Sequence, residues 1–324
     1  MKKVLLLYPR LDVNFGGIKG QKVRVDKKLI NDSNRILWKK FLDNLIEVYN
    51  KRSDVDLEVL EMPLFEFTPK LVESKKPDIV FVPHKESHQF KVRDIPTYYY
   101  MQTAMRWMFS IDSKGWAGGA SVYPFNSIFN DNIDSKAFEM FRERALTNES
   151  KIAQPSFREL NLPENFVLFA CQVPTDQTIK FHSKVDVGKA LMYTLQTTQR
   201  LNIPLVVKPH PSRQDTQVFL KNAVSNFKHA IWLPNASIHQ LIQMSKCLVV
   251  VNSGTGMEAL LHKKPVVTFG KAEYDCVANP ATRDTLDHVL NNLTYDQQNV
   301  YKFFDSWYNW CYDTDNIETF NKLP

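Results

Sequence analysis

Short apolar runs alternate with longer amphipathic stretches along most of this chain of 324 residues. The apolar runs have the length of buried strands, and the stretches between them carry apolar residues at helical spacing. This alternation is typical of βαβ units, in which helices connect parallel strands and cover the faces of a sheet. We expect strands at residues 4–8, 57–60, 79–82, 97–101, 166–171, 205–208, 230–233, 247–251 and 265–269.

The stretches between these strands predict helices at residues 26–51, 185–200 and 215–226, with two more beginning near Ser237 and Met257. A chain of this length favours two domains. The boundary is expected where Pro155 and Pro163 flank a polar stretch. We therefore predict an α/β protein of two Rossmann-like domains, residues 1–155 and 156–294, which face a central cleft at the carboxyl ends of their sheets.

The segment 295–324 begins with an aromatic, helical pattern that includes Phe304, Trp307 and Trp310. Two interpretations stay open. Aromatic residues at helical spacing are usually core residues, here in a helix that packs back across the two domains. Aromatic residues with neighbouring lysines are also typical of a surface that docks on a membrane.

Composition narrows the classes of function. With 44% hydrophobic and 23% charged residues, the chain is an ordinary folded protein. It has no run near eighteen apolar residues and no small-residue cleavage site near its start, so we expect neither a membrane span nor a secretory signal, and a cytoplasmic location. The net charge of +6 is spread through the chain. It suits an anionic substrate or an anionic membrane surface, whereas nucleic-acid binding would require a basic stripe.

The four cysteines form no CxxC pair, and most lie in or beside apolar runs. Reduced core thiols are therefore expected, with no disulfide and no zinc site. The ten glycines are scarce and mostly clustered. Clusters at residues 16–20, 115–119 and 254–256 suggest turns or a close approach of the backbone to a ligand.

The most informative motif spans residues 249–260, where a strand runs through Asn-Ser-Gly-Thr-Gly into a helix. Backbone N–H groups at such a helix start, with the hydroxyls of Ser253 and Thr255 around Gly254, form a site for a phosphate. Glu258, one turn later, could accept hydrogen bonds from ribose hydroxyls. The alternative is that Ser253 or Thr255 caps the helix, with Glu258 as its capping-box partner. No Walker lysine follows these glycines.

Two further motifs follow expected strands. Lys208-Pro209-His210-Pro211 places an imidazole between two prolines that fix its backbone, with Arg213 close behind. Gln172 and Asp176 follow the strand at 166–171. A carboxylate at that place could serve as nucleophile or base in glycosyl chemistry, or it could cap the next helix.

Taken together, QVxxD, KPHP and NSGTGMEALLHKKPVVTFGKAEYD resemble the bacterial capsule polysaccharide synthesis family, whose members include β-Kdo glycosyltransferases that use CMP-Kdo. The resemblance covers residues 166–275. It implies a GT-B glycosyltransferase that binds its donor mainly through the second domain and needs no metal and no cofactor. This fits the lack of a DxD motif suited to bridging a nucleotide through a metal ion.

The resemblance also implies roles for individual residues. Asp176 would be the catalytic nucleophile of a retaining reaction, and His210 would contact the donor phosphate or assist its departure. Asp112, in the first half, is a candidate for activating the acceptor hydroxyl, although a turn aspartate fits that stretch as well. The remaining implied donor-binding residues are Gln172, Lys208, Pro211, Arg213, Ser253, Gly254, Thr255 and Glu258, with Lys180 as a further cation for the Kdo carboxylate.

The expected reaction moves Kdo from CMP-Kdo to a surface polysaccharide or glycolipid, with contact at the inner face of the cytoplasmic membrane. Two alternatives stay open. Sialyltransferases also combine an HP motif with a Ser/Thr phosphate motif, so another CMP-linked sugar such as sialic acid is one. A non-catalytic protein that binds a glycan or a nucleotide is the other.

Overall fold

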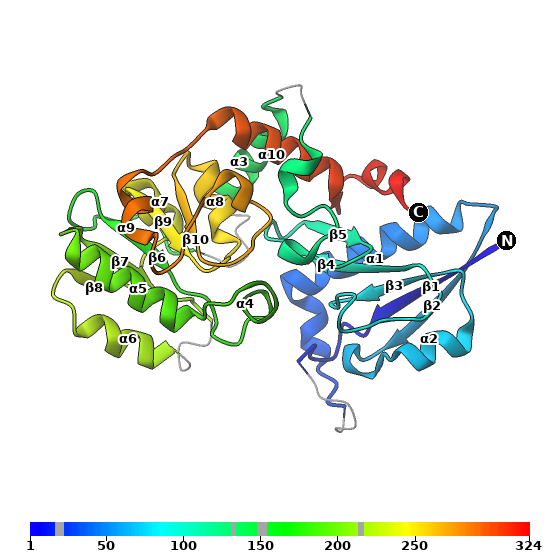
Figure 1. Ribbon diagram of the computed structural model, residues 1–324. Coiled ribbons are helices and arrows are strands. Elements are labelled where there is room, and N and C mark those ends of the chain that lie inside the picture. The colour runs from blue at the N-terminus through cyan, green and yellow to red at the C-terminus, as the bar shows by residue number, and fades with distance from the viewer. Residues whose placement is uncertain (17–22, 131–133, 148–153, 213–216) are drawn as a thin grey trace. The chain divides into compact units, whose positions relative to one another are not determined.

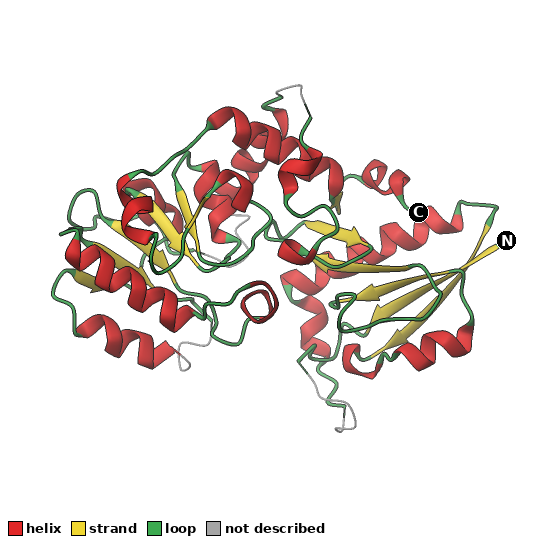
Figure 2. Cartoon of the chain, viewed as in Figure 1, coloured by secondary structure: helices red, strands yellow, loops and turns green. Residues whose placement is uncertain are grey.

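The computed structural model describes residues 1–16, 23–130, 134–147, 154–212 and 217–324. These residues form two compact units (Figures 1 and 2). The first unit contains Met1–Ser121 and Tyr308–Pro324, and the second contains Val122–Trp307. Each is built on a six-stranded sheet with helices around it, so the predicted α/β fold with two parallel-sheet domains, the architecture of GT-B glycosyltransferases, is confirmed.

The sheet of the first unit has the order β12-β5-β4-β3-β1-β2. Strands β1 to β4 run parallel to one another, whereas β5 is antiparallel to β4 and β12 is antiparallel to β5. The bounds are β1 (Lys2–Pro9), β2 (Val55–Met62), β3 (Ile79–Pro83), β4 (Thr97–Gln102), β5 (Met108–Asp112) and β12 (Tyr312–Asp313).

Both faces of this first sheet are buried, which explains its continuous apolar runs. Successive strand residues point to opposite faces, so Val4 and Leu6 pack under helix α1 (Ser33–Asn50). Leu5 and Leu7 pack with Val72 of helix α2 (Pro69–Lys75) on the other face.

The sheet of the second unit is parallel throughout and has the order β11-β10-β9-β6-β7-β8. When these six strands are renumbered 1 to 6 along the chain and the sheet is read from β8 to β11, this is the order 3-2-1-4-5-6 of the Rossmann fold. The bounds are β6 (Val167–Ala170), β7 (Leu205–Lys208), β8 (Ala230–Trp232), β9 (Cys247–Val250), β10 (Val266–Thr268) and β11 (Asn279–Pro280).

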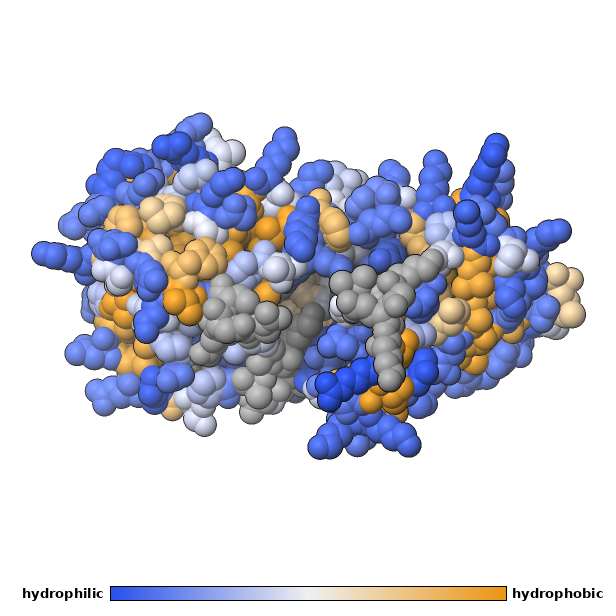
Figure 3. Space-filling model, turned by 90° about the horizontal axis from the view of Figure 1, so that it is seen from below, coloured by the Kyte–Doolittle hydropathy of each residue, from blue (hydrophilic) through white to orange (hydrophobic). Residues whose placement is uncertain are grey.

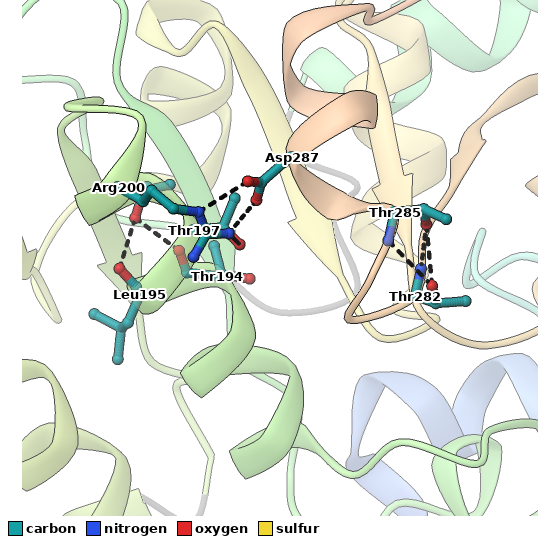
Figure 4. Close-up of polar contacts among 8 residues, drawn as sticks. Thr194, Leu195, Thr197, Arg200, Thr282, Thr285 and Asp287 are labelled. Carbon is teal, nitrogen blue, oxygen red and sulfur yellow. Dashed lines mark hydrogen bonds and ion pairs between the residues drawn. The ribbon is translucent and has the colours of Figure 1, made fainter.

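Helices cover both faces of this second sheet. Helices α5 (Val187–Arg200), α6 (Val218–Ser225) and α9 (Leu286–Asn291) share one apolar core with it. Arg200 at the end of α5 pairs with Asp287 of α9 (Figure 4), with 2.9 Å from Nε to Oδ2. On the opposite side in Figure 1, helix α8 (Thr255–Leu261) packs against β9 and β10. Helices α7 (Ile238–Met244) and α3 (Lys136–Leu146) pack against α8.

The nine predicted strands are confirmed within a few residues, but β5, β11 and β12 were not predicted. The predicted domain boundary between residues 155 and 156 differs from the division into units, because α3 packs within the second unit. The segment 295–324 is divided as well. Most of helix α10 (Gln297–Trp310) lies in the second unit, and the residues from Tyr308 onward belong to the first.

Three aromatic side chains of α10 are core residues, those of Phe303, Phe304 and Trp307, whereas Trp310 is half-buried. Phe304 and Trp307 are fully buried, and their rings meet those of Phe138 and Phe141 of α3 at centroid distances of 5.4–5.6 Å. Because these side chains are covered, the interpretation of this segment as a membrane-docking surface is wrong for Phe304 and Trp307.

The side of the molecule in Figure 3 carries hydrophobic patches among hydrophilic residues. No described helix combines the length and apolar character that crossing a bilayer requires.

Two histidines of the second unit lie side by side, one in α7 and one at the end of α8. His239 of α7 and His262, just after α8, bring Nδ1 and Nε2 within 3.0 Å. Burial, His239 and the nearby cations Arg142 and Lys264 lower the pKa of His262 to about 4. Burial also lowers the pKa of His239. The folded protein therefore keeps this pair neutral at pH values where the unfolded chain, with a histidine pKa of about 6.5, takes up protons.

We predict that the stability from this pair is fully present above about pH 6.5 and is lost as the pH falls toward about 4. In a His262→Gln variant, the fall in melting temperature between about pH 7 and about pH 5 should be smaller than in the wild type by about 2–4 °C. Differential scanning fluorimetry measures this. A His288→Gln control, at an exposed histidine of α9, should behave like the wild type. An equal fall in melting temperature between these pH values in the wild type and in His262→Gln would contradict the prediction.

Candidate functional site

The candidate site lies where the strand order of the second sheet reverses. From β6 the chain continues to β7 and β8 on one side, and it then crosses to β9 on the other side. In open parallel sheets such a reversal leaves a crevice at the carboxyl ends of the strands, and ligands bind there. The three sequence motifs follow β6, β7 and β9, which are adjacent strands. The topology therefore brings the three motifs to one edge of the sheet.

Gln172 and Asn252 join the loops after β6 and β9. The Asn252 backbone N–H donates to Gln172 Oε1 at 3.0 Å, and Gln172 Nε2 donates to Asn252 Oδ1 at 3.1 Å. Both side chains are buried, at 4% and 6% exposure. Asn252 Nδ2 also donates to the carbonyl oxygens of Thr178 and Lys271, at 2.8 and 3.3 Å. Gln172 and Asn252, which we call the amide clasp, thus hold the loops after β6 and β9 together by paired hydrogen bonds.

Asp176 caps helix α4 (Gln177–His182), as the alternative in the sequence analysis proposed. Its Oδ1 accepts hydrogen bonds from the backbone N–H and from the hydroxyl of Thr178, at 2.9 and 2.8 Å. Among the described residues, no donor binds Oδ2. The side chain is half-buried. A cap that uses one oxygen leaves the other available for chemistry.

His210 follows β7 and is held by a residue that the sequence analysis did not single out. Gln217, at 1% exposure, accepts from the His210 backbone N–H at 2.8 Å and donates to the His210 carbonyl at 2.9 Å. The Ser212 N–H lies 3.2 Å from His210 Nδ1, and the Ser212 carbonyl oxygen lies 3.4 Å from the same nitrogen. Ser212 therefore holds the imidazole ring in either tautomer.

The other predicted residues of this loop lie in different environments. Lys208 ends β7 with 6% exposure, and its ammonium donates to the Pro234 carbonyl at 3.0 Å. Burial lowers the pKa of Lys208. Pro211 is exposed beside His210. Arg213 lies outside the described residues. Lys180 is exposed on α4.

The turn after β9 presents two hydroxyls at the start of α8. Gly254 is the N-cap residue of α8. The Ser253 hydroxyl donates to Thr255 Oγ1 at 3.1 Å, and Ser253 Oγ accepts from the N–H of Thr255, the first residue of the helix, at 3.3 Å. The Ser253 side chain therefore binds one N–H at the helix start from a position one residue before the cap. These residues and Glu258, in the first turn of α8, are all half-buried. Their polar atoms are thus within reach of a ligand at this edge.

The segment 270–275 supports this turn by close packing. Tyr274 is fully buried and its hydroxyl donates to the Ser253 carbonyl. A Cβ on Gly256 would lie 2.2 Å from the Tyr274 ring. A Cβ on Gly270 would lie 2.8 Å from Ser183 Cβ and 3.2 Å from Asn252 Nδ2. Glycine is required at both positions because neighbouring side chains occupy the space.

Asp112, in the first unit, ends β5 and is 4% exposed. Its Oδ1 accepts from the backbone N–H groups of Lys114, Gly115 and Ser121 at 2.8–3.1 Å, and its Oδ2 accepts from the Ser121 hydroxyl at 2.5 Å. This is the turn-forming arrangement that the sequence analysis kept as an alternative. A carboxylate with both oxygens engaged by its own loop organises that loop.

Three residues of the site were missed: Thr178, Gln217 and Asn252. Asn252 stands directly before Ser253 in the motif, so its position was a usable signal. The role of Gln217 depends on the path of its loop, for which the sequence carries no signal. Among the described residues, no three His, Cys, Asp or Glu side chains gather in a way that could hold a metal ion.

We predict that Gly256→Ala destabilises the second unit by about 1–3 kcal/mol, because the added methyl group overlaps the buried Tyr274 ring. Urea unfolding followed by tryptophan fluorescence measures the change. Gly188→Ala is the matched control. Its Cβ would meet Phe219 at 3.2 Å, but that side chain is 51% exposed and free to move, and alanine favours the helix. An unchanged stability of Gly256→Ala would contradict the packing argument.

Comparison with known proteins agrees with this architecture. KpsC of Thermosulfurimonas dismutans, in a structure titled beta Kdo 2,7 transferase, superposes with a TM-score of 0.54 at 15% identity, covering 100% of this chain and 99% of that one. The KpsC beta Kdo 2,4 transferase of the same organism gives 0.51 at 14% identity, covering 83% and 87%. At these identities the likeness shows a shared fold.

Curated relatives match over shorter regions. The capsule polysaccharide export protein KpsS of Escherichia coli is 26% identical over 124 residues, which is 35% of this chain and 32% of KpsS. Protein FixF of Sinorhizobium fredii (strain NBRC 101917 / NGR234) is 29% identical over 135 residues, 40% of this chain and 32% of FixF. The matches thus span about a third of the length of these relatives.

A family model described as capsule polysaccharide biosynthesis protein matches residues 123–298, which is more than half of the chain. The matched region contains the whole second sheet and all three motif loops at its reversal point. The chain therefore belongs to the capsule polysaccharide biosynthesis protein family.

Proposed function

We propose that this protein is a glycosyltransferase that moves Kdo from CMP-Kdo to a surface polysaccharide or glycolipid acceptor, with retention of anomeric configuration. One observation carries the proposal. Asp176, His210 and the Ser253–Thr255 turn follow three adjacent strands, β6, β7 and β9, at the reversal of strand order. The family membership and the fold shared with the two KpsC Kdo transferases support the choice of sugar.

The chemistry of the donor fits these groups. A CMP-sugar carries one phosphodiester, which hydroxyl and backbone donors at the Ser253–Thr255 turn can bind, with the His210 ring as a further donor. When the bond between the anomeric carbon and the phosphate oxygen breaks, the electron pair leaves with CMP. Donors aimed at that phosphate stabilise the developing charge.

Asp176 supplies the nucleophile in this scheme. Its free oxygen attacks the anomeric carbon while CMP departs, which forms a glycosyl ester on the enzyme. The acceptor hydroxyl then attacks the same carbon, loses its proton to a base and releases Asp176. Two displacements restore the original configuration. The hydrogen bonds from Thr178 hold the other oxygen of Asp176 away from the reaction.

In this proposal the enzyme is cytoplasmic, meets its acceptor at the inner face of the membrane, and needs neither cofactor nor metal. The test is release of CMP from CMP-Kdo in the presence of a lipid-linked glycan acceptor, with and without EDTA. Calorimetric titration with CMP and UDP should show preference for CMP. Failure to bind CMP and to turn over CMP-Kdo would refute the proposal.

The two alternatives give different outcomes in the same assays. Turnover of CMP-sialic acid in place of CMP-Kdo would indicate a transferase of another CMP-linked sugar. Tight CMP binding without turnover of any CMP-sugar would indicate a binding protein. The half-buried, accessible hydroxyls at the turn and the free oxygen of Asp176 favour a catalyst over that last reading.

For Asp176→Asn we predict loss of transfer activity by about 10³-fold or more with unchanged CMP affinity, because an amide cannot form the glycosyl ester. Intact-protein mass spectrometry after a short incubation with CMP-Kdo should show a Kdo adduct on the wild type and none on the variant. Asp186→Asn is the matched control, because Asp186 caps α5 as Asp176 caps α4. Equal activity of wild type and Asp176→Asn would exclude the nucleophile.

For His210→Ala we predict a decrease in kcat/KM for CMP-Kdo of about 10²–10⁴-fold, because the donor to the leaving phosphate is lost. A fluorescence-coupled assay of CMP release measures the rate of the reaction. His288→Ala, at an exposed histidine far along the chain, should match the wild type. A change in KM alone would show that His210 binds the donor without assisting the departure of CMP.

A further inference from the structure

A set of hydrogen bonds that starts at Gln172 connects the turn after β9 with Asp176. Gln172 Nε2 donates to Asn252 Oδ1 at 3.1 Å and to Thr178 Oγ1 at 3.4 Å. Thr178 Oγ1 in turn donates to Asp176 Oδ1 at 2.8 Å. Asn252 is the neighbour of Ser253 in the chain. The turn that carries the two hydroxyls is therefore linked to the carboxylate through three side chains, those of Asn252, Gln172 and Thr178.

The direction of these bonds follows from the chemistry of the groups. An amide nitrogen has two hydrogens and can serve both Asn252 and Thr178. A hydroxyl has one hydrogen, and because Thr178 accepts from Gln172, its own hydrogen is available for Asp176. The carboxylate can only accept. Each group therefore donates or accepts hydrogen bonds according to the hydrogens that it carries.

A second connection holds Thr178 in place. Asn252 Nδ2 donates to the Thr178 carbonyl at 2.8 Å, and the Thr178 N–H donates to Asp176 Oδ1 at 2.9 Å. Thr178 is therefore bound through its backbone and its side chain between the amide clasp and Asp176. The N–H and the hydroxyl of Thr178 both donate to the same oxygen, Oδ1, so together they fix the rotation of the carboxyl group as well as its position.

We propose that Thr178 is a positioning residue for Asp176, an inference that rests on the proposed function. Its hydroxyl fixes which carboxylate oxygen faces the anomeric carbon, and the amide clasp keeps that orientation in register with the turn that binds the phosphate. The backbone N–H alone permits rotation about the Cβ–Cγ bond. The hydroxyl supplies the second point that prevents it.

The variants Thr178→Val and Thr178→Ser test this inference. Valine keeps the shape of the side chain but removes the hydroxyl, and serine restores the hydroxyl. In single-turnover experiments, Thr178→Val should form the Kdo adduct about 10–100-fold more slowly than the wild type, with unchanged affinity for CMP. Thr178→Ser should recover most of the rate. Gln172→Glu, which removes both amide donors, should share the defect.

Thr194→Val is the matched control. Thr194 is fully buried in α5 of the same unit, and its hydroxyl donates to the Ala190 carbonyl at 2.8 Å. This variant loses a hydroxyl without affecting Asp176, so its adduct rate should equal that of the wild type. Circular dichroism and thermal unfolding of every variant show whether a slower rate arises from loss of the fold. Should Thr178→Val not fold, Thr178→Ala provides the same comparison.

Two results would overturn the inference: a wild-type rate in Thr178→Val, or an equal defect in Thr178→Ser and Thr178→Val. Crystal structures of the wild type and Thr178→Val give a readout that needs no donor. The Asp176 carboxyl group should rotate in the variant, and an unchanged orientation would also overturn the inference. A wild type that neither binds CMP nor forms an adduct would refute the proposed function instead, while the crystallographic comparison would still decide the role of Thr178.

Discussion

The reversal of strand order between β6 and β9 is the constraint on which the rest of the site depends. Neighbouring parallel strands end at the same edge, so the loops that follow them must share a small space. Without direct hydrogen bonds between them, these loops could adopt many positions relative to one another. The amide clasp closes the space with two reciprocal hydrogen bonds between Gln172 and Asn252. A buried, fully paired amide set of this kind tolerates few other arrangements.

Close packing provides the second layer of order. Gly256 and Gly270 allow Tyr274, Ser183 and Asn252 to approach within distances that no larger residue permits. The Tyr274 hydroxyl then donates to the Ser253 carbonyl. The turn is thus held by a buried ring and by the amide clasp, while its hydroxyls are half-buried. Buried groups support the turn, and a few polar atoms are left for chemistry.

The sequence was sufficient for the α/β class, for most strands and for the three motif loops, because apolar runs and strand–loop–helix junctions are local patterns. It was insufficient for β5, for the two-residue strand β11, and for β12, whose pairing with β5 joins residues far apart in the chain. Gln172 was expected to bind the donor, and its pairing with Asn252 depends on the strand order, although the place of Asn252 in the motif was visible in the sequence. Asp112 and Asp176 show the same limit, since a turn or capping aspartate and a catalytic one have the same local sequence.

The C-terminal residues have a consequence for how the chain is made. Strand β12 completes the edge of the first sheet beside β5, yet it follows the whole second unit along the chain. During synthesis β5 must therefore wait with an unpaired edge while the entire Rossmann sheet is produced and folds. The second unit is a continuous stretch and has no such dependence. The order of assembly is thus opposite to the order of synthesis, with the unit that emerges first being the one completed last.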